Sequence, residues 1–298
     1  MKQVEERYIS LLTDFGFKRI FGTAMNKDLL ICFLNSLFNG RQVVKDVSYL
    51  NPEHVGDVYT DRKAIFDVYC EGENGEKFIV EMQNAYQVYF KDRSLFYSTF
   101  PIREQAPKGN DWDFKLNHVY TVALLNFNMN EDAFDKEKIR HHVQLCDTAT
   151  HKIFYDKLEF IYVEIAKFNK TLEELETLYE KWLYALKNLY KLTQRPKELC
   201  DKVFDRLFEE AEIAKFTPQE MREYEASKMA YRDIKNSIDT AKQEGLAEGM
   251  EKGMKKGMEK GMNQKALDIA RNMLADSVDI NLIMKYSGLT QEQIEKLK

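Results

Sequence analysis

Two acidic residues stand inside apolar runs that follow each other closely along the chain. Asp67 lies within the run 64–70, and Glu81 lies near the end of the run 78–83. Burying a carboxylate among Ile, Val, Phe and Tyr side chains costs free energy unless a positive charge compensates it. Two such carboxylates in neighbouring runs therefore predict a site for a divalent metal, which takes oxygen ligands. Metal-dependent hydrolysis of a phosphodiester is the chemistry that this site favours.

The turn between the two runs decides whether the carboxylates face each other. It contains Asn74-Gly75, a strong signal for a hairpin. A two-residue loop would place Glu81 on the opposite face from Asp67, because side chains alternate along a strand. A three-residue loop with Gly75 in the left-handed conformation pairs Asp67 directly with Glu81 and puts Gln83 on the same face. We predict this loop, and a metal that relieves the repulsion between carboxylates whose Cβ atoms would be about 5 Å apart.

A solvent-facing strand pair is the alternative explanation of the same spacing. In that case Phe66, Val68 and Val80 would form the buried half of an antiparallel pair, and the acidic residues would simply be solvated. The rest of the chain has to distinguish the two explanations.

Composition describes a folded protein of one or two domains. The chain has 298 residues, of which 44% are hydrophobic and 31% are charged. We expect no signal peptide and no transmembrane helix, because no apolar run reaches about 18 residues. Four widely spaced cysteines predict buried thiols in a reducing compartment, so we expect a cytoplasmic protein. A net charge of −5 argues against a general nucleic-acid coat protein but allows a local basic strip.

The order of the expected elements narrows the fold to an α/β layout with a mixed sheet. An apolar helix comes first, then three strands, a second helix and a further strand, and the acidic residues fall on the second and third strands. The expected helices are 27–38 and 88–105, and the expected strands are 43–50, 63–70, 77–83, 118–127, 139–146 and 159–167.

This order, together with Asp67 and Glu81-Met82-Gln83, resembles the PD-(D/E)XK nuclease superfamily, and in detail its recombination-promoting, transposase-like Rpn branch. The resemblance covers most of the chain and implies a restriction-endonuclease-like core with a mixed sheet flanked by helices, plus an α-helical C-terminal extension. The other segments that carry it are 14–18, Phe21-Gly22, 79–83, 93–97 with Gln105, 120–127 and a tail of Glu-Gly-x-x-x-Gly repeats.

The resemblance implies roles for the acidic residues. Asp67 and Glu81 would ligate Mg²⁺, or Mn²⁺ in its place, with the backbone carbonyl of Met82 as a further ligand. Asp14, in the N-terminal segment 14–22 that leads into the helix 27–38, would be an accessory acidic residue, unless it is merely a helix cap.

Gln83 stands where most members of the superfamily carry a catalytic Lys. An amide can orient water, but it cannot supply the charge of an ammonium group. Lys18, from the same N-terminal segment as Asp14, is our candidate for the missing catalytic cation.

Three residues of the second helix have spacings of four and eight that place them on neighbouring parts of one face. Arg93, Tyr97 and Gln105 are predicted to contact DNA phosphates at the rim of the site. Helix packing with a surface arginine is the alternative, and it is favoured for Tyr97.

Two functions follow from these residues. The first is a Mg²⁺-dependent endonuclease of low sequence specificity that acts on double-stranded DNA in recombination. The alternative is a catalytically inactive relative that binds DNA or a protein through the same fold.

We divide the chain into a nuclease-like domain (1–169), a helical region (170–243), a glycine-repeat segment (244–262) and a small helical unit (263–298). Glycine recurs every fourth residue from Gly245 to Gly261, and each repeat drifts by about 40° around a helix. We interpret this segment as a marginally stable helical spacer or as a self-association element that would make a homo-oligomer. The last unit has the pattern of a helix-turn-helix remnant but lacks basic residues, so we favour a packing or interaction module.

Overall fold

Apolar and polar side chains alternate along the central strand of the protein, and this alternation sets the layers. In strand β5 (Lys77–Gln83), Phe78, Val80 and Met82 are buried in the largest core cluster. Ile79 belongs to a separate cluster, which lies on the opposite face. Because neighbouring residues of a strand point to opposite faces, β5 must be covered on both sides. The computed structural model describes residues 6–54, 64–106, 113–129 and 131–297.

The main sheet has six strands in the order β1-β4-β5-β6-β8-β7. The pairs β5/β6 and β6/β8 are parallel and the other three pairs are antiparallel, so the sheet is mixed. The other strands of this sheet are β1 (Val47–Tyr49), β4 (Val68–Gly72), β6 (Val119–Leu125), β7 (Arg140–Cys146) and β8 (Ile153–Glu164). This arrangement confirms the predicted α/β fold with a mixed sheet.

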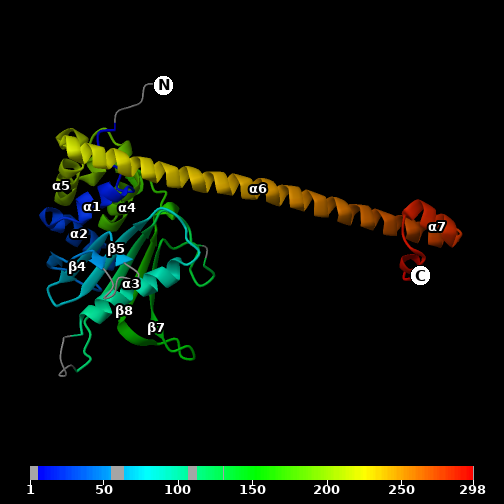
Figure 1. The fold of residues 1–298 in the computed structure, drawn as a ribbon, viewed down its shortest axis with the longest axis horizontal. Coiled ribbons are helices and arrows are strands. Elements are labelled where there is room, and N and C mark those ends of the chain that lie inside the picture. The colour runs from blue at the N-terminus through cyan, green and yellow to red at the C-terminus, as the bar shows by residue number, and fades with distance from the viewer. Residues whose placement is uncertain (1–5, 55–63, 107–112, 130, 298) are drawn as a thin grey trace. The chain divides into compact units, whose positions relative to one another are not determined.

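Helices cover the two faces of the sheet unequally (Figure 1). One face packs in the largest core against α1 (Asp14–Phe21), α2 (Lys27–Phe38), α4 (Leu178–Asn188), α5 (Lys202–Glu210) and the start of α6 (Pro218–Ala275). The other face packs against α3 (Phe90–Glu104), whose Phe90 joins the side chains of β6 and β8. Short 3₁₀ turns lie at Ala24–Asn26, Ile165–Lys167, Leu172–Glu174, Leu189–Lys191, Lys197–Leu199 and Ile213–Lys215.

The hairpin between β4 and β5 has the predicted register. Val68 pairs with Val80 and Glu71 with Lys77, and Gly75 adopts a φ of +83°. The Gly72 amide donates to the Glu76 carbonyl, which leaves a loop of three residues. Continuing the same register by one residue places Asp67 opposite Glu81, so the prediction of the three-residue loop is confirmed.

The strand expected over 63–70 is interrupted just where the aspartate stands. β3 (Ala64–Ile65) leaves the main sheet and pairs with β2 (Glu53–His54), whereas β4 begins only at Val68. The prediction of one continuous strand was therefore wrong. The Phe66 amide donates to the Pro52 carbonyl, which draws the chain away from β5 and leaves Asp67 in the break.

Other expected elements also differ in their bounds: the strand expected over 159–167 is β8, which begins earlier, at Ile153, and ends at Glu164. The first strand is shorter than 43–50, because the Val44 amide and carbonyl are bonded to the side chain of Asn35 instead of a strand. In the helical region predicted from residue 170, the first α-helix begins only at Leu178, where Thr177 and Glu180 form a capping box. A capping box satisfies the free amides of a helix start, so a new helix begins there.

The described chain forms two compact units, Met1–Lys235 and Asn236–Lys298, and the division falls within α6. The helices that follow residue 169 therefore share the core of the sheet up to Lys235. In the second unit, Ala270 of α6 packs with α7 (Ile280–Ser287) and α8 (Gln291–Glu295). The glycine repeat is helical throughout. Among the described residues, no helix is long and apolar enough to cross a bilayer.

Candidate functional site

The Asp67 side chain accepts the hydrogen bond that a backbone carbonyl would accept if the β4/β5 pairing continued past Val68. Its Oδ2 accepts the backbone amide hydrogen of Met82 at 2.9 Å. The N–H and C=O of one strand residue point to the same edge, so the Met82 carbonyl also faces the edge on which Asp67 lies. The break before β4 thus brings a carboxylate and a free strand edge together.

Glu81 lies opposite Asp67 and is buried, with only 6% of its surface exposed. Its Oε2 accepts a hydrogen bond from Gln83 Nε2 at 3.0 Å and lies 3.6 Å from the Arg93 guanidinium. Its other oxygen, Oε1, is buried with no hydrogen-bond partner among the described residues. An unsatisfied buried carboxylate oxygen is costly, so Oε1 is available to a ligand.

Both carboxyl groups have raised pKa values, chiefly because they are buried. Burial, together with the neighbouring Asp67 carboxylate, raises the pKa of Glu81 to about 8. Burial also raises the pKa of Asp67, although the Met82 amide and the Lys18 charge oppose this effect. Burial is the larger cause of both shifts, and the nearby charges of Lys18 and Arg93 oppose it without cancelling it.

Lys18 reaches this pair from α1, on the other side of the strand break. Its Nζ lies 3.8 Å from Asp67 Oδ1 and 2.7 Å from Asp14 Oδ1. Burial lowers the pKa of Lys18, but the Asp14 hydrogen bond and the charges of Asp14, Asp67 and Glu81 outweigh it and raise the pKa. Lys18 is therefore a cation held between two carboxylates, and Asp14 meets the site through Lys18.

The start of α1 is held close to its neighbours, and this contact positions Lys18. Thr13 caps the helix by accepting the Gly16 amide at 3.1 Å. A Cβ at Gly16 would lie 2.1 Å from the Ser10 carbonyl oxygen. The Ser10 amide also donates to the Tyr224 hydroxyl, at 3.1 Å, from the start of α6. The sequence analysis did not identify these positioning residues. The pattern that could have indicated them is Thr13 three residues before Gly16, because Thr is a favoured N-cap residue.

Arg93 and Tyr97 come to the carboxylate pair from α3. The Arg93 guanidinium lies over the Tyr97 ring, 5.5 Å from its centroid, and also contacts Glu81. Tyr97 packs edge-to-face on Phe66 at 5.2 Å. Burial and the nearby Glu81 carboxylate raise the pKa of the Tyr97 hydroxyl. Tyr97 is thus a packing residue that also borders the site.

Gln105 is not brought to the same place. Its side chain donates to the Pro101 carbonyl and accepts the Asn117 amide, which ties the end of α3 to the segment before β6. At 1.5 Å per residue, the twelve residues that separate it from Arg93 span about 18 Å of helix. These contacts favour a structural role for Gln105.

The donor set near Asp67 suits a hard divalent cation. Mg²⁺ prefers oxygen ligands. Here they come from the two carboxylates, including the unpartnered Glu81 Oε1, and from the Met82 carbonyl on the adjacent strand edge. No group of three or more His, Cys, Asp or Glu side chains suited to a metal occurs within the described residues. A cation here would therefore take two side-chain ligands, and Mg²⁺ commonly keeps several waters.

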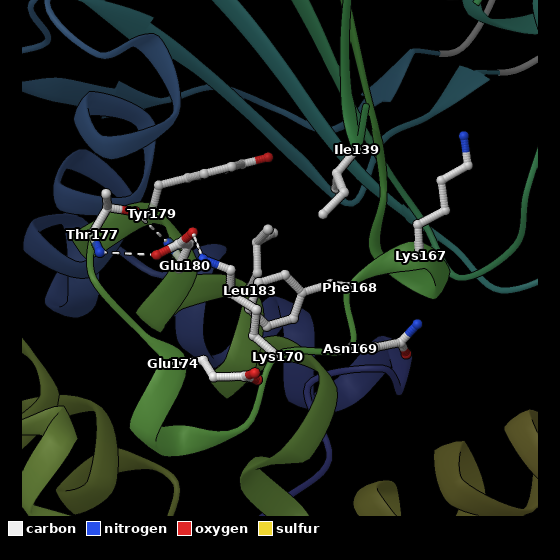
Figure 2. A pocket seen from close by; sticks show the side chains of 10 residues that line it. All are labelled: Ile139, Lys167, Phe168, Asn169, Lys170, Glu174, Thr177, Tyr179, Glu180 and Leu183. Carbon is white, nitrogen blue, oxygen red and sulfur yellow. Dashed lines mark hydrogen bonds and ion pairs between the residues drawn. The ribbon is translucent and has the colours of Figure 1, made fainter. Parts of the chain in front are cut away.

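A separate cavity of about 410 Å³ lies beside α4 (Figure 2). The Tyr179 hydroxyl is buried there without a described partner. Lys170 pairs with Glu180 at 2.5 Å, and Lys167 pairs with Glu164 at 2.5 Å. Both lysines at this cavity are thus neutralised by ion pairs, and none of the predicted site residues lines it.

Comparison with known proteins gives two family matches. Residues 11–241 match the model of the PD-(D/E)XK nuclease family transposases. Residues 263–298 match the C-terminal HTH domain of the Rpn/YhgA-like nuclease family. The preference for a packing module over a helix-turn-helix at this end is therefore corrected. No match was found among curated proteins or among solved structures. The first match covers well over half of the chain, so the protein belongs to the PD-(D/E)XK nuclease family transposases and carries the HTH domain of Rpn/YhgA-like nucleases at its end.

Proposed function

We propose that this protein is a Mg²⁺-dependent endonuclease that hydrolyses phosphodiester bonds of double-stranded DNA with low sequence specificity. One observation carries the proposal: Glu81, buried opposite Asp67, keeps an unpartnered oxygen beside the free edge at Met82. Membership of the nuclease family and the HTH domain both support DNA as the substrate.

Asp67 and Glu81 would hold a divalent cation, which would supply polarisation of the scissile phosphate and a more nucleophilic water at neutral pH. The protein's own residues keep these ligands in place. The Met82 amide orients Asp67, whereas Gln83 and Arg93 hold one oxygen of Glu81. Glu81 therefore presents Oε1 with little freedom to rotate, and fixed ligands lower the cost of binding a cation.

The cation that Gln83 cannot supply comes from the helices. Gln83 uses its Nε2 hydrogen on Glu81, which leaves its carbonyl oxygen to orient water. Lys18 Nζ lies within 3.8 Å of Asp67, on the side away from Arg93's helix. We assign Lys18 the role of stabilising negative charge on the phosphate in the transition state, because a preorganised cation acts most strongly in a site shielded from water.

Cleavage of supercoiled plasmid with Mg²⁺ and with EDTA tests the proposal. Asp67→Ala and Glu81→Ala should abolish nicking. Asp46→Ala is the matched control, because this carboxylate is exposed and paired with Lys27 away from the site. Unchanged cleavage in either site variant would refute the assignment.

The Lys18 role has its own test. Lys18→Met should lower the turnover rate by about 100- to 1,000-fold, the range seen when one group that stabilises transition-state charge is lost. Lys18→Arg should restore part of the rate, since it keeps the charge. An equal loss in both variants, with unchanged folding, would show that Lys18 only positions α1.

The catalytically inactive alternative rests on Gln83, which offers no ammonium group. It predicts that the wild type binds DNA in a gel-shift assay but leaves plasmid intact with Mg²⁺ or Mn²⁺. Gln83→Lys would then be the informative variant, because gain of cleavage would show that only this residue was missing.

A further inference from the structure

An exposed aromatic groove lies next to the carboxylate pair, and the proposed hydrolysis does not account for it. The groove has a volume of about 610 Å³ and is formed by the segment 87–97, at the start of α3. Its apolar lining is Val88, Tyr89, Phe96 and Tyr97, and its polar lining is Gln87, Asp92 and Arg93. We call it the α3 groove.

The side chains of the α3 groove are exposed to an extent that packing alone does not explain. Val88 is 72% exposed, Tyr89 is 75% exposed and Phe96 is 43% exposed. Single exposed apolar residues are ordinary, but a contiguous apolar patch beside a site marks an interaction surface. The faces of these rings are therefore available to a ligand.

Arg93 joins the groove to the carboxylates. Its guanidinium lies over the Tyr97 ring at 5.5 Å, donates to Gln87 at 2.8 Å and lies 3.6 Å from Glu81. A group bound in the groove thus contacts the same arginine that contacts the proposed metal ligand. A strand whose phosphate sits at Asp67 and Glu81 would carry its adjacent nucleotide over the groove.

Flat aromatic faces together with an arginine suit one occupant in particular. Nucleobases stack on aromatic side chains without regard to sequence, and arginine adds a cation–π contribution. Asp92 and Gln87 can accept or donate hydrogen bonds at a base edge. In a paired duplex both faces of a base are stacked on its neighbours, so an occupant of this groove has to be unstacked.

We propose that the α3 groove binds an unpaired base of the substrate strand, so that the preferred substrate is DNA with a single-stranded or frayed segment next to the cleaved bond. This inference rests on the proposed function, because a base bound in the groove determines which phosphodiester bond is cleaved only if the carboxylate pair is the cleavage site. The binding itself does not require cleavage, and the two can be measured separately.

Fluorescence anisotropy in EDTA, with labelled oligo(dT)₂₀ and with a 20-base-pair duplex, measures the groove alone. Tyr89→Ala and Phe96→Ala should each weaken oligo(dT)₂₀ binding about tenfold, the order expected for loss of stacking on one ring. Phe154→Ala is the matched control, because this ring is 84% exposed on β8 and lies outside the groove. It should leave binding unchanged.

Cleavage with Mg²⁺ gives the second readout. The wild type should cleave a forked duplex faster than a fully paired one, and the double variant Tyr89→Ala/Phe96→Ala should lose that preference while still nicking plasmid. If no substrate is cleaved but the ring variants weaken oligo(dT)₂₀ binding, the proposed function fails and the groove inference stands.

Other results would overturn the inference. Equal affinity of the wild type and both ring variants for oligo(dT)₂₀ would show that the groove binds no base. The same conclusion follows if the wild type fails to bind oligo(dT)₂₀. In that case an amphipathic peptide that binds the wild type but not the ring variants would identify the groove as a site for a protein partner. Circular dichroism of each variant checks that the fold is kept.

Discussion

Removing the charge of Glu81 should stabilise the metal-free protein at neutral pH. The folded-state pKa of Glu81 is raised to about 8 from an ordinary value of 4.5. A raised acid pKa means that the folded state binds the proton more tightly than the unfolded state. Stability from this group is therefore fully present below pH 4.5 and is lost as the pH rises towards 8.

The size of the effect follows from the shift. Between pH 4.5 and 7, Glu81 should cost about 3 kcal/mol of unfolding free energy, because each pH unit in this window is worth about 1.4 kcal/mol. The group is buried, so solvent screening does not reduce this figure substantially. Glu81→Gln, which cannot ionise, should not pay this cost.

Urea unfolding in EDTA at pH 5, 6, 7 and 8 measures the difference between the wild type and Glu81→Gln. Tryptophan fluorescence is a suitable probe, since Trp182 is fully buried in the compact unit that contains Glu81. The difference should shift by about 3 kcal/mol in favour of Glu81→Gln between pH 5 and pH 8. Mg²⁺ should then stabilise the wild type and leave the variant unaffected.

A pH-independent difference between the two proteins would refute this reasoning. It would mean that Glu81 titrates normally in the folded protein, so that burial and the Asp67 charge do not act on it. An equal stabilisation of both proteins by Mg²⁺ would place the cation elsewhere.

Three further changes test the elements that support the site. Gly16→Ala should destabilise the protein by more than about 1 kcal/mol and lower cleavage, because its Cβ would meet the Ser10 carbonyl at 2.1 Å; an unchanged melting temperature would contradict this. Thr177→Ala should lower the free energy of unfolding by about 1 kcal/mol by removing the cap of α4, and urea unfolding without such a loss would show that the cap is dispensable. Gly253→Ala should stabilise α6 by about 1 kcal/mol, since nothing lies within 4 Å of the added Cβ. A helix melt followed by circular dichroism measures this gain, whereas weaker self-association in sedimentation would instead show that the glycine repeat pairs two copies.

Local signals in the sequence were enough for the hairpin and for several helix ends. Asn74-Gly75 predicted the loop, and its left-handed glycine sets the register that continues to Asp67 and Glu81. Thr217 followed by Pro218 is a typical helix start, and α6 begins at Pro218, where the Thr217 side chain accepts the Glu220 amide. Turn and cap residues act on neighbours a few positions away, so their effect can be read without the tertiary structure.

The break in the strand at Asp67 could not be read in this way. The run 64–70 is apolar throughout apart from the aspartate, and it was expected to be one strand. Its first residues, Ala64 and Ile65, instead pair with β2. This pairing forms only when the folded chain brings β2 next to them. Competition between two strand partners is decided by tertiary packing.

The sequence by itself determined the carboxylate pair, because the side-chain alternation of β5 and the chemistry of one turn put Asp67 and Glu81 on the same face. The tertiary structure decided which cations meet that pair. Lys18 and Arg93 arrive from α1 and α3, which pack with opposite faces of the sheet. The positions of Lys18 and Arg93 depend on how the apolar sides of the two helices pack against the strands. Contacts between residues so far apart in the chain produce no local sequence pattern from which they could be predicted.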